Sequence, residues 1–132
     1  MEASNKMSSI PDEITNSQDV IDIRDVIERI EYLEAEESLD NIDKEELKSL
    51  KKLMKNCEGM GGDEEYKGIW YPLLLIREDY FEDYAQQEAE DLGLIKTDLS
   101  WPYNCIDWEE AAEQLKLDYT DIDFKGVTYY AR

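Results

Sequence analysis

The excess of acidic over basic side chains constrains the fold of this chain more than any other feature. Aspartate and glutamate number 34 against 14 lysines and arginines, which gives a formal net charge of −20 at pH 7. Self-repulsion of that size opposes a compact state, so a folded chain needs a substantial apolar core. The chain can supply one, because 42% of its 132 residues are hydrophobic and 14 are aromatic. Disordered acidic tails lack such a content, and we therefore expect a folded, highly charged protein.

The absence of histidine removes several kinds of catalytic and metal site. Serine triads, cysteine–histidine dyads and His-ligated metal centres all need an imidazole, and the chain has none. Cys57 and Cys105 form no C-x-x-C pair, so we exclude a structural zinc and expect both to be buried apolar thiols. We expect a protein without catalytic activity.

One segment resembles a calcium-binding loop. Asp121-x-Asp123-x-Lys125-Gly126 has carboxylates and a glycine at the required spacing, but Lys125 occupies a ligand position and Arg132 stands where the loop needs glutamate. We therefore expect no metal and no cofactor.

Nothing in the chain predicts a membrane span or a signal peptide. The longest apolar run, residues 69–76, includes a proline and is too short to cross a bilayer. The first eleven residues lack the charged-then-apolar order of a signal peptide. We expect a soluble protein in the cytoplasm of a host cell. Its charge also opposes binding to nucleic acids or anionic membranes.

Aromatic residues are distributed unequally along the chain. Residues 1–66 hold 19 acids, 8 bases and two aromatics, whereas residues 67–132 hold 15 acids, 6 bases and the other 12 aromatics. We therefore expect an α+β, helix-dominated fold whose core lies mainly in the second half. Three segments are predicted: a flexible lead-in over 1–18, an acidic helical hairpin over 19–66 and a compact α+β domain over 67–132. The side chains expected in the core are Trp70, Phe81, Tyr84, Trp101, Trp108 and Leu115.

Two amphipathic helices are predicted in the first half. Asp22 can cap the first, and Asp43-x-x-Glu46 has the pattern of a capping box for the second. Glycines at 59, 61 and 62 end the second helix, and the pair forms a hairpin. The apolar positions follow helical spacing: Ile23, Val26, Ile27, Ile30 and Leu33 in the first helix, and Leu47, Leu50, Leu53, Met54 and Cys57 in the second.

The second half predicts two helices and a β-hairpin. Residues 69–76 are either a buried strand or a helix start, and a helical period then runs from Asp79 to a cap at Gly93. The capping-box pattern Asp107-x-x-Glu110 begins another helix. Alternating apolar residues around a Lys125-Gly126 turn predict a β-hairpin over 119–132.

The acidic surface of these two helices is the candidate site. Two pairs, Glu78-Asp79 and Glu82-Asp83, lie four residues apart, so their side chains are about 5–6 Å from each other on a helix. Duplex DNA carries one charge per about 1.7 Å, so 20 charges correspond to roughly 34 Å of duplex. A globule of this length has a similar diameter, roughly 35–40 Å. The residues predicted to bind a partner are Glu78, Asp79, Glu82, Asp83, Glu90, Asp91, Glu109, Glu110 and Glu113.

Part of the second half resembles a known family. The motif Ile106-Asp107-Trp108-Glu109-Glu110-Ala111-Ala112, followed by Gly126-Val127-Thr128-Tyr129-Tyr130, is similar to the end of ArdA-type antirestriction proteins. The segment 75–85 with Trp101-Pro102 is similar to small phage proteins that share this ending. The resemblance covers about residues 69–132. It implies a phage or plasmid protein that imitates bent DNA, commonly as a homodimer, and occupies the DNA site of restriction enzymes. The chain is shorter than that family, and its first half differs from the family's leading domain.

Three functions remain open from the sequence. The first is an inhibitor that mimics DNA and blocks a host nuclease, either a restriction enzyme or a CRISPR effector. The second is an adaptor whose helical hairpin, residues 22–57, binds a partner helix. The third is a metal-dependent enzyme that uses carboxylates. Binding of the first kind weakens steeply as salt rises, whereas an apolar helix–helix interface does not.

Overall fold

The structure is a computed structural model that describes residues 11–94 and 101–132. Within these residues, four α-helices and six strands confirm the predicted α+β class with its C-terminal β-hairpin. The elements are β1 (Val20–Asp22), α2 (Ile23–Ala35), α3 (Asn41–Cys57), β2 (Glu64–Tyr66), β3 (Ile69–Tyr71), β4 (Leu74–Arg77), the 3₁₀ turn η1 (Glu78–Tyr80), α4 (Phe81–Asp91), the 3₁₀ turn η2 (Tyr103–Cys105), α5 (Trp108–Lys116), β5 (Thr120–Phe124) and β6 (Val127–Ala131).

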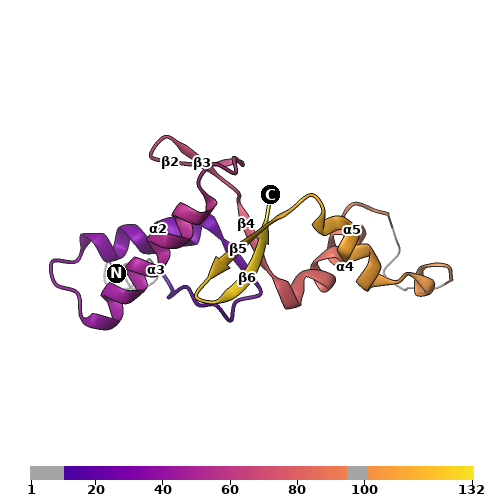
Figure 1. The fold of residues 1–132 in the computed structure, drawn as a ribbon, viewed down its shortest axis with the longest axis horizontal. Coiled ribbons are helices and arrows are strands. Elements are labelled where there is room, and N and C mark those ends of the chain that lie inside the picture. Colours follow the sequence, from indigo (N-terminus) through magenta and orange to yellow (C-terminus); the bar gives the residue numbers. More distant parts are fainter. Residues whose placement is uncertain (1–10, 95–100) are drawn as a thin grey trace, which may run out of the picture.

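A four-stranded antiparallel sheet forms the centre of the molecule. Its strand order is β1-β4-β6-β5, and the register pairs Ile21 with Leu75, Ile76 with Tyr130 and Ile122 with Tyr129. β2 and β3 form a separate two-stranded ribbon that projects from the body in Figure 1.

Helices cover both faces of this sheet. Because successive side chains in a strand point to opposite faces, Leu75 and Tyr129 pack with α2 and α3, whereas Ile76 and Tyr130 pack with α4 and α5. Figure 1 shows the two helix pairs on opposite sides of the central strands. The molecule therefore has three layers and two cores, with the larger core on the α2–α3 side.

The prediction that the core lies mainly in the second half is wrong. Of the 16 buried residues in the larger core, ten belong to residues 14–57 and are aliphatic or sulfur-containing. Phe81 is fully buried as predicted, and Tyr84, Trp108 and Leu115 are partly buried. Trp70 and Trp101, by contrast, are 53% and 78% exposed. Alternation along β3 turns Trp70 outward while Tyr71 is buried.

The segment before the first helix is packed rather than flexible where the structure describes it. Residues 1–10 of the predicted lead-in lie outside the described residues. In residues 11–18, Ile14 is buried and the Asn16 amide donates to the Lys125 carbonyl at 3.1 Å. The Tyr129 hydroxyl donates to the Gln18 carbonyl at 2.7 Å. β1, which the sequence did not predict, pairs with β4, so the two halves share one sheet.

Capping explains where the helices begin, with one correction. Asp22 and Asp107 cap α2 and α5 as predicted, each accepting a hydrogen bond from a backbone N–H of the first turn. The cap of α3 is Asp40, whose carboxylate accepts from the Asp43 N–H at 2.8 Å. The predicted capping box from Asp43 to Glu46 is therefore wrong, because α3 begins earlier and Glu46 lies inside it.

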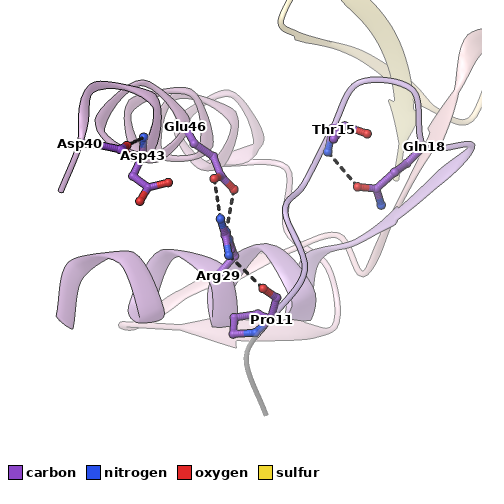
Figure 2. A network of polar contacts seen from close by, with 7 residues as sticks. All are labelled: Pro11, Thr15, Gln18, Arg29, Asp40, Asp43 and Glu46. Atoms are coloured by element: carbon purple, nitrogen blue, oxygen red, sulfur yellow. Dashed lines mark hydrogen bonds and ion pairs between the residues drawn. The ribbon is translucent and has the colours of Figure 1, made fainter. Parts of the chain in front are cut away.

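Glu46 instead turns into the layer between α2 and α3. Figure 2 shows its carboxylate facing the Arg29 guanidinium, which donates from Nε at 2.7 Å and from Nη2 at 2.8 Å. Arg29 Nη1 also donates to the Pro11 carbonyl at 2.9 Å. One buried ion pair thus joins α2, α3 and the segment that precedes β1.

Candidate acidic binding surface

All nine predicted site residues lie on one side of the sheet. Glu78 and Asp79 are in η1, four more are in α4 and three are in α5. The two helices pack against each other and against the sheet through the smaller core. Eight of the nine are exposed, and Glu90 is half-buried. We call residues 78–94 and 107–117 the acidic layer.

The charge of the acidic layer is almost uncancelled. Its two segments contain 11 carboxylates and one basic residue, Lys116. The Lys116 ammonium lies 5.6 Å from the centre of the Phe81 ring and 5.0 Å from that of Tyr130, and its side chain is only 20% exposed. Residues 19–58, which include α2 and α3 on the opposite face, hold 13 acids and 7 bases. Negative potential is therefore concentrated on the acidic layer.

An aromatic cluster holds the acidic layer on the sheet despite this repulsion. The Phe81 ring from α4 lies 5.1 Å from Tyr119 and 5.4 Å from Tyr130, both in edge-on geometry. Such pairs contribute about 0.5–1.5 kcal/mol each beyond the area they bury. The hydroxyls of Tyr84 and Tyr119 share a hydrogen bond at 3.2 Å. Burial raises the pKa of Tyr84, so the phenol stays neutral near pH 7. The aromatic cluster thus fixes the helices that carry the carboxylates on the sheet.

Contacts within the protein already engage some of the nine carboxylates. Glu78 accepts a hydrogen bond from the Tyr130 hydroxyl at 3.3 Å, and Asp79 lies 3.5 Å from Arg77 Nε. Glu110, Glu113 and Asp91 accept from neighbours on their own helices. Among the residues that the structure describes, no hydrogen bond or ion pair engages the side chains of Glu82, Asp83 or Glu109. These three are the most available to a partner.

The carboxylates of the acidic layer differ in whether they lie at the beginning or at the end of a helix, and therefore in whether they stabilise that helix. Glu82 and Asp83 lie in the first turn of α4, and Glu109 and Glu110 in that of α5. Negative charge there is stabilised by the helix dipole by about 0.3–1 kcal/mol. Glu88, Glu90 and Asp91 lie at the other end of α4, and no basic residue is present in its last turn. The dipole makes negative charge unfavourable at that end. Asp91 gains a hydrogen bond from the Gln87 amide at 3.1 Å, so Glu88 and Glu90 are the two acids that helix stability does not explain.

The other chemical candidates find little support in the described part of the chain. No group of three or more His, Cys, Asp or Glu side chains there could hold a metal ion. The calcium-loop candidate forms the β5–β6 hairpin, where the Asp123 carboxylate accepts from the Gly126 N–H at 3.4 Å. Cys57 is buried as predicted. Cys105 is exposed, so the prediction that it is a buried apolar thiol is wrong. No helix of the described residues is long and apolar enough to cross a membrane.

Sequence reasoning found the acidic residues but missed what supports them. Tyr119 and Tyr130 complete the aromatic cluster, and Lys116 is directed onto its rings. The alternation in residues 119–132 indicated that Tyr130 faces away from Tyr129, but it did not indicate which helices cover that face.

Comparison with family models, with curated proteins and with solved structures gives no match for this chain. The likeness of residues 69–132 to ArdA-type antirestriction proteins stays a prediction.

Proposed function

We propose that this protein is a DNA mimic, encoded by a phage or mobile element, that inhibits a DNA-targeting defence nuclease of the host. The target is a restriction enzyme or a CRISPR effector with a basic DNA groove. The observation that carries the proposal is the acidic end of α4, where Glu88 and Glu90 have no compensating cation in the last turn. Carboxylates kept where they destabilise their own helix indicate a use outside the fold.

Inhibition needs no chemistry from this chain. The carboxylates of the acidic layer take the place of phosphates and meet the lysines and arginines that otherwise hold DNA. Long-range attraction between the two surfaces raises the association rate, and paired charges fix the register of the complex. Support from the sheet and the aromatic cluster keeps the carboxylates in place before the partner arrives, which lowers the entropy lost on binding.

The structure favours this function over the adaptor. The apolar sides of α2 and α3 are buried in the larger core, including Val26, Ile30 and Leu33 of α2 and Leu50 and Leu53 of α3. A partner helix would have to displace the sheet to reach them. The large exposed side chains of the two helices are charged or polar except for Ile42, which is 75% exposed in the first turn of α3. One apolar residue does not form a stripe for a partner helix.

A cleavage assay with purified enzymes tests the proposal. Restriction enzymes and CRISPR effectors are each incubated with the protein before DNA is added, and DNA binding is measured in parallel. We expect at least one enzyme to lose DNA binding, with inhibition that excess DNA reverses and that weakens steeply as salt rises. Inhibition of cleavage with DNA still bound, or no inhibition in any enzyme class, would contradict the proposal.

The resemblance also implies a homodimer, and we propose this as the active form. Sedimentation equilibrium gives the mass directly, and a mass of one chain, 15.5 kDa, at working concentration would contradict it.

A further inference from the structure

A cavity rich in lysine lies on the side of the molecule opposite the acidic layer. It has a volume of about 270 Å³ and is bounded by α2, α3 and the β2–β3 turn. Three lysines, Lys51, Lys55 and Lys67, line it together with two glutamates, Glu34 and Glu58. A larger cavity of about 480 Å³ beside residues 11–18 is lined by four carboxylates and no basic residue. The chain as a whole has 34 acids and 14 bases, whereas the lining of this cavity has more basic than acidic residues.

The three ammonium groups come from two parts of the fold, α3 and the β2–β3 turn. Lys51 and Lys55 lie one turn apart on α3, and Lys67 comes from the turn of the β2–β3 ribbon. Lys67 has a φ of 52°, in the left-handed region that favours glycine or asparagine. Its ammonium lies 5.3 Å from the centre of the Tyr66 ring. Lys125 has a similar φ of 51° in the turn between β5 and β6, so the hairpin turn accounts for this conformation, and the turn places Lys67 at the cavity.

The floor of the cavity is apolar. Ile30 and Met54 are 3% and 6% exposed, and the Tyr66 ring forms one wall. A ligand with a flat carbon group can therefore lie against these side chains while its charged end meets the lysines at the rim.

Two carboxylates of the chain, Glu34 and Glu58, already line the cavity. The Glu34 carboxylate lies 2.7 Å from Lys51 Nζ, and it is 35% exposed. The ammonium groups of Lys51 and Lys67 lower the pKa of Glu34 below its usual value. Among the described residues, no carboxylate lies within 4.0 Å of the ammonium of Lys55 or Lys67, so both can serve an incoming anion.

We infer that this cavity binds a small phosphate monoester that carries a flat apolar group, the chemistry of a nucleoside monophosphate. A phosphate accepts charge-assisted hydrogen bonds from the lysines, and the ring packs on Ile30, Met54 and Tyr66. The volume of about 270 Å³ lies just below the range of about 300–1,000 Å³ that is usual for ligand pockets, so the ligand must be small, with one ring system and one phosphate. The inference is independent of DNA mimicry, because the cavity and the acidic layer lie on different faces.

Titration of the full-length protein with adenosine monophosphate, followed by amide NMR at physiological ionic strength, tests the inference. We expect saturable shifts confined to residues 30–34, 51–55 and 66–68. Adenosine, which lacks the phosphate, and inorganic phosphate, which lacks the ring, should each bind at least about tenfold more weakly. Lys67→Gln and Lys55→Gln should each weaken binding of adenosine monophosphate about tenfold, the cost of one lost charge-assisted hydrogen bond.

Lys44→Gln is the matched control, because Lys44 is an exposed lysine of α3 that does not line the cavity. It should leave binding unchanged. Three results would overturn the inference: shifts that do not saturate in the low millimolar range, equal affinity for adenosine and its monophosphate, or equal weakening by Lys44→Gln and Lys67→Gln. Amide spectra of each free variant show whether it is folded.

Discussion

The Arg29 guanidinium and the Glu46 carboxylate face each other through two parallel hydrogen bonds of 2.7 and 2.8 Å (Figure 2). Their side chains are only 12% and 4% exposed. The pair joins two helices of an acidic protein and gives a partner to Glu46, the buried carboxylate among the described residues. Arg29 also lies over the Tyr32 ring at 5.5 Å.

Breaking this pair should destabilise the protein far more than breaking a surface pair. Removing one partner of a buried ion pair typically costs about 3–5 kcal/mol, because the other charge stays buried. We expect Glu46→Gln to lower the free energy of unfolding by about 3 kcal/mol in urea denaturation. The matched control is Glu34→Gln, which breaks the exposed Glu34–Lys51 pair and should cost below about 1 kcal/mol. Equal losses in the two variants would show that the buried pair has no special role.

Phe81 should be far more sensitive to truncation than the exposed aromatic residues of the second half. It is fully buried and packs against Tyr84, Tyr119 and Tyr130. Truncation of a buried phenylalanine costs about 3–5 kcal/mol, so Phe81→Ala should lower the midpoint of thermal unfolding strongly. Trp101→Ala, at a residue 78% exposed, should change stability by less than about 0.5 kcal/mol. The reverse order would contradict the placement of the smaller core.

The two cysteines should differ sharply in reactivity. Burial raises the pKa of the Cys57 thiol to about 12, whereas Cys105 is exposed. Because the thiolate is the reactive form, a thiol-specific reagent at pH 8 should modify one cysteine per folded chain and two after unfolding. Mass spectrometry of peptides should place the first label on Cys105. Early labelling of Cys57 would mean that α3 does not pack on the sheet as described.

Stability should fall in alkaline solution because of buried phenols. Burial raises the pKa of Tyr129 to about 12, so the folded state holds the proton more tightly than the unfolded state does. The resulting stabilisation is complete below pH about 10, the unfolded pKa, and is lost as pH rises towards 12. Urea denaturation between pH 8 and pH 11 measures this loss.

Tyr129→Phe separates ionisation from packing. It removes the hydrogen bond to the Gln18 carbonyl, so it should cost about 1 kcal/mol at pH 8. It should also show a shallower fall of stability with pH than the parent chain. An unchanged slope would show that Tyr129 does not contribute to the alkaline loss.

Local patterns in the sequence predicted the helices and the final hairpin well. The caps at Asp22 and Asp107 and the turn at Lys125-Gly126 depend on neighbouring residues alone, and the structure has all three. β1 was missed because it has three residues and exists through its pairing with β4, more than fifty positions away. The pattern at Asp43 and Glu46 was misleading because Asp40, three residues earlier, also fits a cap.

The candidate site was predictable in composition but not in arrangement. Charge and helical spacing identified the nine exposed or half-exposed carboxylates, since acids on the outer side of a helix stay in water. They did not show that Lys116 turns onto Phe81 and Tyr130, or that the bases of α3 lie across the sheet. Those features depend on which helix pair covers which face, and the period of a strand leaves that choice open.

The central claim is that the acidic layer, and not net charge in general, blocks the nuclease. Two variants that lose the same number of charges test this claim in the cleavage assay with purified nuclease, with DNA binding measured in parallel. The first changes Glu82, Glu88, Glu90 and Glu109 to Gln, which includes two acids from the last turn of α4 and spares Glu78 and Asp79 with their contacts to Tyr130 and Arg77. The second changes Glu28, Glu31, Glu36 and Glu37 to Gln, all exposed in or just after α2. Circular dichroism checks that both remain folded, since the first loses some dipole stabilisation.

The most direct measurement is the inhibition constant of these two variants against the same nuclease, across a series of salt concentrations. We predict that the acidic-layer variant inhibits at least about tenfold more weakly and has a shallower salt dependence. The α2 variant should stay within about threefold of the parent protein, because its charges lie outside the contact and act only through the screened field. Equal losses in both variants, or a larger loss in the α2 variant, would contradict the assignment of the acidic layer as the binding surface.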